Sequence, residues 1–350
     1  MPTLLPHAAH RLSADRSKLK TDGTCPKLEA LVWISVYLLA GSLTSTNQAA
    51  EARPSTVAAV RGASLLPATN WPRRVLRAEQ TWQLNLPKGE RFDASGLVLT
   101  PTGDLLTIND RGPSVYRIQF LAQTNAADLI QLTNCFTRDQ LRPFAREKMD
   151  RYDCEGVALD EQGRLYLCEE VNRWVLRFDQ TRDTVERLPI DWTPVKQYFD
   201  LSDPNASFEG IAVGGGRIYL ANERQMGRII VVDLATLKVL ESFAVRPHDS
   251  NARDIHYTDL SYFEGILYVL LRESRCVLAV DPRNQQVVGE FNFKEMEREP
   301  QVIYRALFPT GQMEGLAVDK DFIWLVTDNN GTARGRYPTD IRPTLFKCRK

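Results

Sequence analysis

Residues 154–170 read Cys-Glu-Gly-Val-Ala-Leu-Asp-Glu-Gln-Gly-Arg-Leu-Tyr-Leu-Cys-Glu-Glu, and this stretch contains the pattern that decides the fold. Glu155 precedes a short apolar run, the chain turns between Asp160 and Gly163, a second apolar run returns, and Glu169 and Glu170 follow it. Short apolar runs separated by a turn that contains Gly or Asp predict a β-hairpin. The stretch therefore predicts two antiparallel strands with acidic side chains at their open ends.

The same hairpin recurs along the chain. Its five copies begin Ala94-Ser95-Gly96-Leu97, Cys154-Glu155-Gly156-Val157, Phe208-Glu209-Gly210-Ile211, Thr258-Asp259-Leu260-Ser261 and Met313-Glu314-Gly315-Leu316. The second residues of neighbouring copies lie 50 to 60 positions apart, which suits a propeller blade and is too long for a leucine-rich or ankyrin repeat. We therefore predict an all-β fold, a single β-propeller of four-stranded blades.

Each copy is followed by further apolar runs that predict a third and a fourth strand, except the last. There the chain ends soon after Leu345-Phe346, the third run. The stretch from Val75 to Leu86 precedes the first copy and can supply the missing strand, so that both termini close the ring. This pattern predicts five blades. Six is the alternative, with a degenerate blade in the long connectors at 137–151, 191–206 and 294–308.

The N-terminal segment has the composition of an export signal. Residues 30–43 form an apolar run after several lysines, and Ala50-Glu51-Ala52 is a small-x-small cleavage site. The run is short for a membrane span, although a retained anchor is the alternative. We predict a signal peptide or N-terminal anchor at 1–52, a linker at 53–74 and the propeller at 75–350. The protein is then exported, to the periplasm or the extracellular space.

Charge is balanced, with 44 Lys and Arg against 44 Asp and Glu. A protein that binds nucleic acid needs a clustered basic surface, so we expect no nucleic-acid partner. We also expect no membrane contact beyond the N-terminal segment, and a monomer.

Five cysteines follow the signal, and their spacing is not that of metal ligands: Cys135, Cys154, Cys168, Cys276 and Cys348. Cys154 and Cys168 belong to the two strands of one predicted hairpin. A disulfide between them in an oxidising compartment and a pair of buried thiols are the two alternatives.

A propeller aims equivalent positions of its blades at one axis. The second residue of each copy would then meet the others there: Ser95, Glu155, Glu209, Asp259 and Glu314. Four carboxylates this close cannot all stay ionised without a cation. Calcium prefers about six to eight oxygen ligands, whereas zinc prefers Cys and His, so the pattern predicts a calcium site. In the fourth copy Ser261, on the same strand face as Asp259, is an alternative ligand. The alternative for the whole ring is that these acids only start strands and accept backbone N–H bonds or lie in solvent.

A second set of charged residues follows the second strand of each hairpin and should surround one mouth of the channel. Its acids include three candidates for a catalytic base, Asp110, Glu169 and Glu223. Its arginines are candidates for binding a phosphate or carboxylate group of a substrate: Arg111, Arg173, Arg224 and Arg275. The alternative is that these acids and arginines pair with one another between blades.

The order serine, glutamate, glutamate, variable residue, glutamate resembles the SdiA-regulated and "esterase-like activity of phytase" propellers, as do Phe208-Glu209-Gly210-Ile211-Ala212 and Glu273-Ser274-Arg275. The same order is similar to that of the five-bladed calcium-activated apyrases, which hydrolyse nucleoside diphosphates. The resemblance covers about residues 75–350. It implies an axial calcium ion held by Ser95, Glu155, Glu209, Asp259 and Glu314. Asp259 departs from the serine that is usual in the fourth blade.

Two hypotheses follow for the function. The first is a calcium-dependent hydrolase, phytase-like or esterase-like, in which water activated at calcium attacks an anionic phosphoester or ester. The second is a non-catalytic binding or sensing module in which calcium is structural.

Overall fold

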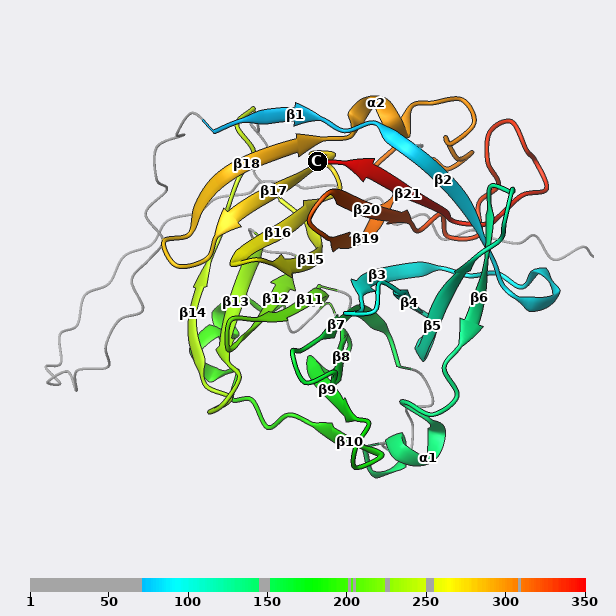
Figure 1. Cartoon of the computed structure of the whole chain (residues 1–350). Coiled ribbons are helices and arrows are strands. Elements are labelled where there is room, and N and C mark those ends of the chain that lie inside the picture. The colour runs from blue at the N-terminus through cyan, green and yellow to red at the C-terminus, as the bar shows by residue number, and fades with distance from the viewer. Residues whose placement is uncertain are drawn as a thin grey trace, which may run out of the picture. The chain divides into compact units, whose positions relative to one another are not determined.

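The computed structural model describes residues 71–144, 152–200, 203, 206–223, 227–249, 255–307 and 310–350. Within these ranges the regular structure is almost entirely β-strand (Figure 1), which confirms the predicted all-β class. The exceptions are short: α1 (Arg138–Leu141), α2 (Lys294–Glu297), η1 (Pro87–Gly89), η2 (Arg142–Phe144) and η3 (Thr193–Tyr198). None of the described helices is long and apolar enough to cross a membrane. The predicted signal and most of the predicted linker lie outside the described residues.

Four-stranded antiparallel order dominates the sheets. Two sheets have four strands, namely β7 (Cys154–Leu159), β8 (Leu165–Glu169), β9 (Trp174–Asp179) and β10 (Thr184–Arg187), and then β11 (Phe208–Gly214), β12 (Arg217–Asn222), β13 (Arg228–Asp233) and β14 (Val239–Phe243). A third sheet has the same order in β15 (Tyr257–Phe263), β16 (Ile266–Leu271), β17 (Cys276–Asp281) and β18 (Gln286–Asn292), with β1 (Arg73–Val75) added alongside β18. The linker predicted at 53–74 therefore extends too far, because its last two residues, Arg73 and Arg74, belong to β1.

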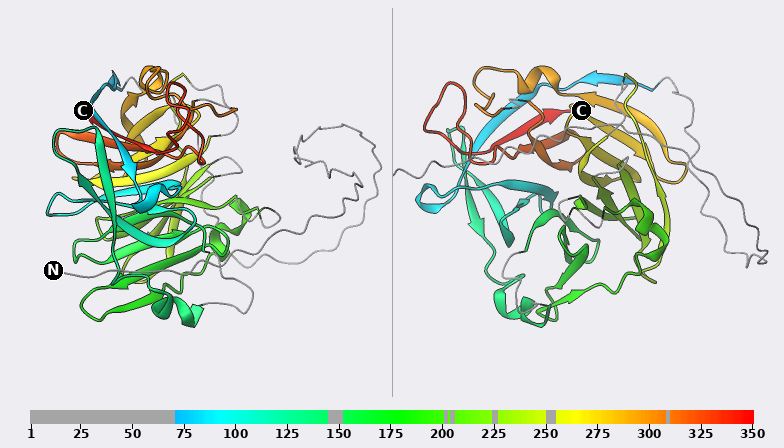
Figure 2. Two further views of the ribbon diagram at one scale, coloured as in Figure 1. Left: turned by 90° about the vertical axis from the view of Figure 1, so that its right-hand side faces the viewer. Right: turned by 180° about the vertical axis from the view of Figure 1, so that it is seen from behind.

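The remaining sheet has eight strands and joins the two ends of the described chain. It consists of β3 (Ala94–Leu99), β4 (Leu105–Asn109), β5 (Gly112–Phe120) and β6 (Ala126–Gln131), followed by β2 (Ala78–Asn85), β21 (Thr344–Arg349), β20 (Phe322–Thr327) and β19 (Met313–Val318). The N-terminal β2 runs antiparallel to the C-terminal β21, with Trp82 opposite Leu345. Figures 1 and 2 show these two strands side by side. The sequence prediction of a strand near Val75–Leu86 beside the last strand is therefore confirmed.

The predicted hairpin at 154–170 shows why these strands form where they do. Asp160 Oδ1 accepts the backbone N–H groups of Gln162 and Arg164, which closes the turn, and Gly163 adopts φ +76°, a conformation that suits glycine. On either side, Val157 pairs with Leu167 in the antiparallel ladder. The residues of the turn and the apolar residues of the strands thus both favour a hairpin at this place.

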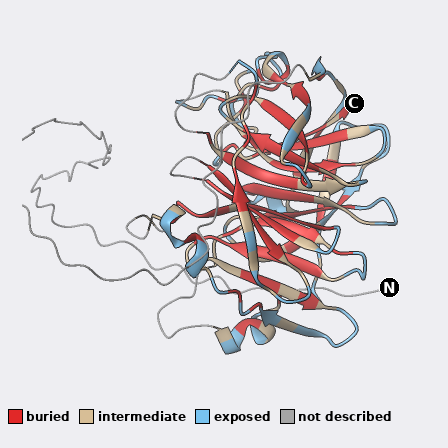
Figure 3. Cartoon of the chain, turned by 90° about the vertical axis from the view of Figure 1, so that its left-hand side faces the viewer, coloured by how far each residue is buried: buried red, intermediate tan, exposed pale blue. Residues whose placement is uncertain are grey.

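The first strands of the five hairpins, β3, β7, β11, β15 and β19, are neighbours of one another in that order, and β19 in turn lies beside β3. Apolar side chains fill the space between adjacent sheets, for example Val231 of β13 with Val269 of β16. Figure 3 shows buried residues along the strands and exposed residues at the hairpin turns. The five cysteines after residue 70 are all buried and unpaired, as the thiol alternative predicts.

Candidate functional site

The first strand of each hairpin carries a β-bulge near its second residue. Cys154 pairs with Glu169 and Gly156 with Cys168, so Glu155 is the extra residue of β7. Glu209 and Glu314 are the extra residues at the same place in β11 and β19. A bulge re-aims the side chain that it carries. All three glutamates line one cavity, together with Ser95 of β3.

The fourth hairpin corrects the sequence alignment by one residue. In β15 the extra residue is Thr258, because Tyr257 pairs with Leu271 and Asp259 with Leu270. Thr258 therefore stands at the position of the glutamates, and Asp259 stands at the position that glycine holds in the other copies. A shift of one residue sends a strand side chain to the opposite face, so Asp259 does not line the cavity.

Asp259 instead binds the backbone of neighbouring strands. Its Oδ2 accepts the N–H groups of Leu316 at 2.7 Å and Leu97 at 3.1 Å, and its Oδ1 accepts the N–H group of Leu260 at 2.8 Å. The side chain is fully buried. This matches the alternative in which a ring acid accepts backbone N–H bonds. Ser261, the alternative ligand, is engaged in the same way, because its Oγ accepts the N–H group of Val318.

Glycine beside the ring residues lets the inner strands approach closely. A Cβ atom on Gly156 would lie 2.7 Å from the backbone nitrogen of Ile211 in the next strand, and one on Gly210 would lie 2.5 Å from Cα of Asp259. Both distances are shorter than any side chain tolerates against backbone. Glycine at these two positions is therefore required by the close approach of the neighbouring strands.

The cavity has a volume of about 400 Å³, and oxygen atoms dominate its lining. Eight of the described lining residues are acids: Asp110, Asp153, Glu155, Glu170, Glu209, Glu223, Glu314 and Asp328. The others are Arg272, which is the single cation among them, Ser95 and Asn330. Both sets that the sequence predicts to meet here, the ring glutamates and the acids of the mouth, contribute to it.

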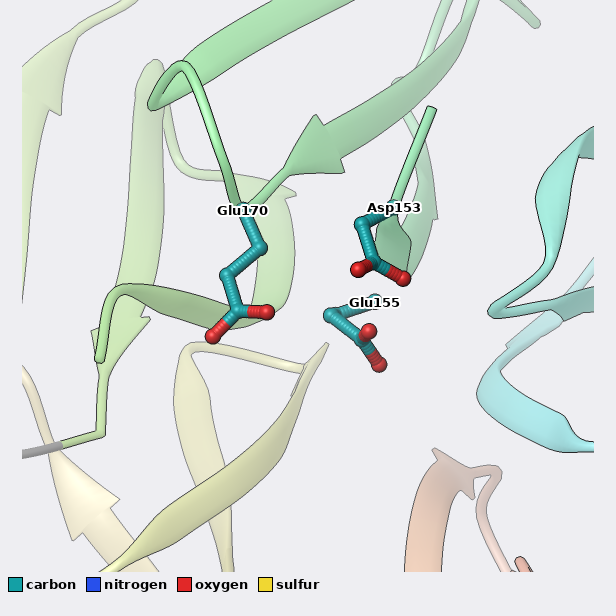
Figure 4. Close-up of side chains that lie close together, drawn as sticks. All are labelled: Asp153, Glu155 and Glu170. Atoms are coloured by element: carbon teal, nitrogen blue, oxygen red, sulfur yellow. The ribbon is translucent and has the colours of Figure 1, made fainter. Parts of the chain in front are cut away.

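Five of these acids offer overlapping sets of ligand atoms. One carboxylate oxygen from each of Asp153, Glu155 and Glu170 lies within 4.8 Å of the others, and the same holds for Glu170, Glu209 and Glu223. Figure 4 shows the first set, with the three side chains converging from two neighbouring strand ends. Both ligand sets consist of carboxylate oxygens, the donors that calcium prefers, and the described residues that line the cavity include no Cys or His. The residues present therefore fit a calcium ion.

Burial and mutual repulsion act together on these acids. Burial raises the pKa of Asp110 to about 7 and that of Asp328 to about 8, and the charges of nearby carboxylates add to both shifts. Burial also raises the pKa of Glu155 and Glu209 well above the ordinary value, again with help from neighbouring carboxylates. Without a cation, part of this cluster holds protons at neutral pH.

The three candidates for a catalytic base lie in different surroundings. Asp110 and Glu223 line the cavity. Glu169 does not, because it is fully buried and its Oε2 accepts the N–H group and the side-chain amide of Asn172. Asp110 Oδ1 has no hydrogen-bond partner among the described residues.

Of the predicted substrate-binding arginines, the three that the structure describes, Arg111, Arg173 and Arg275, are not among the residues that line the cavity. Arg111 lies 3.5 Å from Asp93, and Arg173 donates to the carbonyl of Asp200 and packs over the ring of Phe199. Arg275 adopts φ +54° in the turn after β16, and Arg224 lies outside the described residues. The guanidinium that lines the cavity is that of Arg272. It belongs to the charged group after β16, next to Glu273.

Asp153 and Asn330 line the cavity and are not among the site residues predicted from the sequence, and Asp153 is the one that belongs to a ligand set. It stands two positions before Glu155, and alternate residues of an extended chain share a face. That spacing is the signal that could have identified it.

Comparison with known proteins supports the fold and a family. A family model described as "Phytase-like: Esterase-like activity of phytase" matches residues 93–331. The comparison with curated proteins gives no match. The structure of glutaminyl cyclase from Myxococcus xanthus is similar over 80% of this chain and 98% of its own, with 14% sequence identity and a TM-score of 0.53. This likeness shows a shared β-propeller fold.

Two further structures are more distant. The PQQ-bound aldose sugar dehydrogenase from Streptomyces coelicolor is similar over 78% of this chain and 98% of its own, with 12% identity and a TM-score of 0.39. Virginiamycin B lyase from Staphylococcus aureus is similar over 73% of this chain and 66% of its own, with 11% identity and a TM-score of 0.38. At these scores neither carries an argument.

Proposed function

Because the chain belongs to the phytase-like family described as "esterase-like activity of phytase", we propose that it is an exported, calcium-dependent hydrolase of an anionic phosphoester or ester. The observation that carries the proposal is the acidic cavity, in which eight carboxylates face about 400 Å³. Such a surface repels anionic substrates and offers neutral substrates no electrostatic attraction unless a cation is bound there. The family and the cavity thus support the same kind of chemistry.

The two overlapping ligand sets contain five acids, and four of them would hold calcium: Asp153, Glu155, Glu170 and Glu209. The fifth, Glu223, forms an ion pair with Arg272. A bound calcium ion would polarise the ester oxygen and make a nearby water easier to deprotonate. Ser95 holds Glu155 in place, since its Oγ lies 3.1 Å from Glu155 Oε2 and also donates to the Glu155 carbonyl. Asp259 is not in this proposed set, because backbone N–H groups occupy both of its oxygens.

We assign the role of general base to Asp110. It lines the cavity, its Oδ1 has no hydrogen-bond partner in the described part of the chain, and burial raises its pKa to about 7. A base is most effective when its pKa lies near the working pH. Asp110 would accept the proton of the attacking water on its carboxylate, which lines the cavity.

The ring itself we infer to have five blades. The eight-stranded sheet divides into β3–β6 and into β19, β20, β21 and β2, so that β2 completes the last blade. The parallel pairing of β2 with β6, at Gln83 and Ala126, then joins the outer edges of two neighbouring blades. Such closure removes an open seam between the first and last blades.

A non-catalytic module remains the second candidate, and one observation favours it. Arg272 forms ion pairs with Glu223, Glu273 and Glu314, as expected if the mouth residues serve to lock the ring. In that case calcium would only stabilise the fold.

A substrate screen separates the two candidates. Nucleoside diphosphates, phytate and aryl esters would be offered to the full chain with calcium, and calcium binding would be followed by calorimetry. Glu209→Gln should lose calcium affinity and activity together. Asp110→Asn should lower kcat by about 100-fold or more and change calcium affinity far less. The exposed Glu264→Gln on a distant hairpin turn is the control and should match wild type.

If no substrate turns over faster with wild type than with Glu209→Gln, the hydrolase is excluded and the binding module takes its place. Calorimetry then judges the calcium site separately.

A further inference from the structure

Arg272 brings a guanidinium into the acidic cavity from the end of β16. Its Nη1 donates to Glu314 Oε1, its Nη2 to Glu223 Oε1 at 3.2 Å, and its Nε to Glu273 Oε1 at 3.3 Å. Among the described lining residues it is the sole cation. One side chain therefore contacts two of the carboxylates that face the cavity.

The charge of Arg272 is permanent. The negative charge of Glu314 raises the pKa of Arg272 above its already high ordinary value, and a guanidinium stays protonated in proteins in any case. Its side chain is only 25% exposed, so water screens these pairs less than it screens a surface pair. Arg272 thus acts at every working pH as a fixed monovalent cation.

Other contacts hold the guanidinium in position. Glu273 accepts from Arg272 and from His256 Nδ1 at 2.7 Å, so the carboxylate is anchored from two sides. The stem of Arg272 packs on Gly311, whose Cβ position would lie 3.6 Å from Arg272 Cγ. A guanidinium with three such bonds is oriented before any ligand arrives.

The acids that Arg272 contacts also reach the proposed calcium ligands. Glu223 belongs to the ligand set that it shares with Glu170 and Glu209, and its carboxylate also accepts from Arg272 at Oε1. The ion pairs of Arg272 are with Glu223, Glu273 and Glu314, none of which belongs to the other set, Asp153, Glu155 and Glu170. The guanidinium of Arg272 therefore occupies the side of the cavity formed by Glu223 and Glu314.

We propose that Arg272 is a built-in cation that limits the cavity to a single calcium ion, held by Asp153, Glu155, Glu170 and Glu209. In its absence Glu223 and Glu314 would take up a second divalent ion in place of the guanidinium. This inference rests on the proposed function, because it presumes that the cavity binds calcium at all. Arg272 is thus a residue that determines metal stoichiometry.

Calcium titration calorimetry on the full chain tests the proposal. Wild type should bind one ion, and Arg272→Gln should bind two. Arg272→Lys keeps a positive charge at this place and should bind one. The double variant Arg272→Gln/Glu314→Gln also lacks the guanidinium. Of the two carboxylates that the guanidinium no longer binds, it retains only Glu223, so it too should bind one calcium ion.

The outcomes separate this inference from the proposed function. If wild type binds one ion and Arg272→Gln binds one with the same Kd, the inference is overturned while the proposed function stands. If wild type binds none, both are overturned.

Arg272→Gln leaves neighbouring acids without the guanidinium, which lowers its stability in the absence of metal. Melting with chelator and with calcium then decides: the rise in Tm caused by calcium should be larger in Arg272→Gln than in wild type. An equal rise contradicts the proposal.

Discussion

At the scale of single residues, Asp259 and Gly210 show how tightly the inner strands are fitted. Glycine at this position of β11 leaves no room for a Cβ, and the equivalent position of β15 holds an aspartate whose oxygens bind the backbone of β3, β15 and β19. Burial raises the pKa of Asp259, and the three N–H groups oppose that shift because they favour the carboxylate. Asp259 therefore links three strands.

Asp259→Asn should destabilise the protein. Whichever carboxylate oxygen the amide nitrogen replaces, that nitrogen faces a backbone N–H group, so at least one buried bond is lost. The expected loss is about 2 kcal/mol, measured by urea unfolding. Glu264→Gln removes an acid from the turn of the same hairpin and should have little effect. A midpoint for Asp259→Asn equal to that of the control would show that these bonds contribute nothing.

The acids of the cavity predict an unusual dependence of stability on pH. The folded pKa of Asp110 is about 7 and that of Asp328 about 8, whereas an unfolded aspartate titrates near 4. The folded state therefore holds protons that the unfolded state has released. With chelator present, the contribution of these two groups to the free energy of unfolding should be greatest below about pH 4. That contribution should be lost as the pH rises towards 8.

Unfolding at a series of pH values in chelator measures this slope. The double variant Asp110→Asn/Asp328→Asn should make it shallower between about pH 5 and 8, and the raised pKa values of Glu155 and Glu209 account for the slope that remains. A slope unchanged by the double variant would be evidence against the raised pKa values.

At the scale of the strand and hairpin, the close approach of β7 to β11 depends on Gly156. Gly156→Ala would place Cβ 2.7 Å from the backbone of Ile211, and such overpacking costs about 1–3 kcal/mol. Gly112→Ala is the matched control, since no atom lies within 4 Å of its Cβ position. Thermal unfolding of both variants should show a loss only for Gly156→Ala, and equal Tm values would contradict the packing described.

The N-terminal strand β2 predicts the outcome of a truncation. A chain that starts at residue 90 lacks β2 and leaves β21 with an unpaired edge, which invites aggregation. A chain that starts at residue 71 retains β2 and should stay soluble. Gel filtration and circular dichroism compare the two. A soluble, cooperatively unfolding chain without β2 would place the closing strand elsewhere.

Much of the strand architecture follows from sequence because each hairpin has its own turn chemistry and alternation. The register of the fourth hairpin does not, because Thr258-Asp259-Leu260-Ser261 fits the repeat with either Thr258 or Asp259 at the ring position. Only the bulge in the ladder decides between them. Similarly, Arg272 and Arg275 both follow β16, and sequence alone does not tell which guanidinium enters the cavity.

At the scale of the whole molecule, acids far apart in sequence surround one space. Asp110 and Glu314 are separated by most of the described chain and yet line the same cavity. Closing such a ring concentrates negative charge, and the protein must offset it with protons, with Arg272 or with a metal ion. We propose that a calcium ion beside Asp153, Glu155, Glu170 and Glu209 offsets most of this charge.

The most direct test is a crystal structure of the full chain grown with calcium, with anomalous differences collected at long wavelength. We expect one anomalous peak in the cavity, within about 2.3–2.6 Å of carboxylate oxygens of Asp153, Glu155, Glu170 or Glu209. Crystals of Glu209→Gln should show a weaker peak or none. Well-ordered carboxylates in wild-type crystals with no anomalous peak among them would contradict the calcium site and, with it, the account of the cavity.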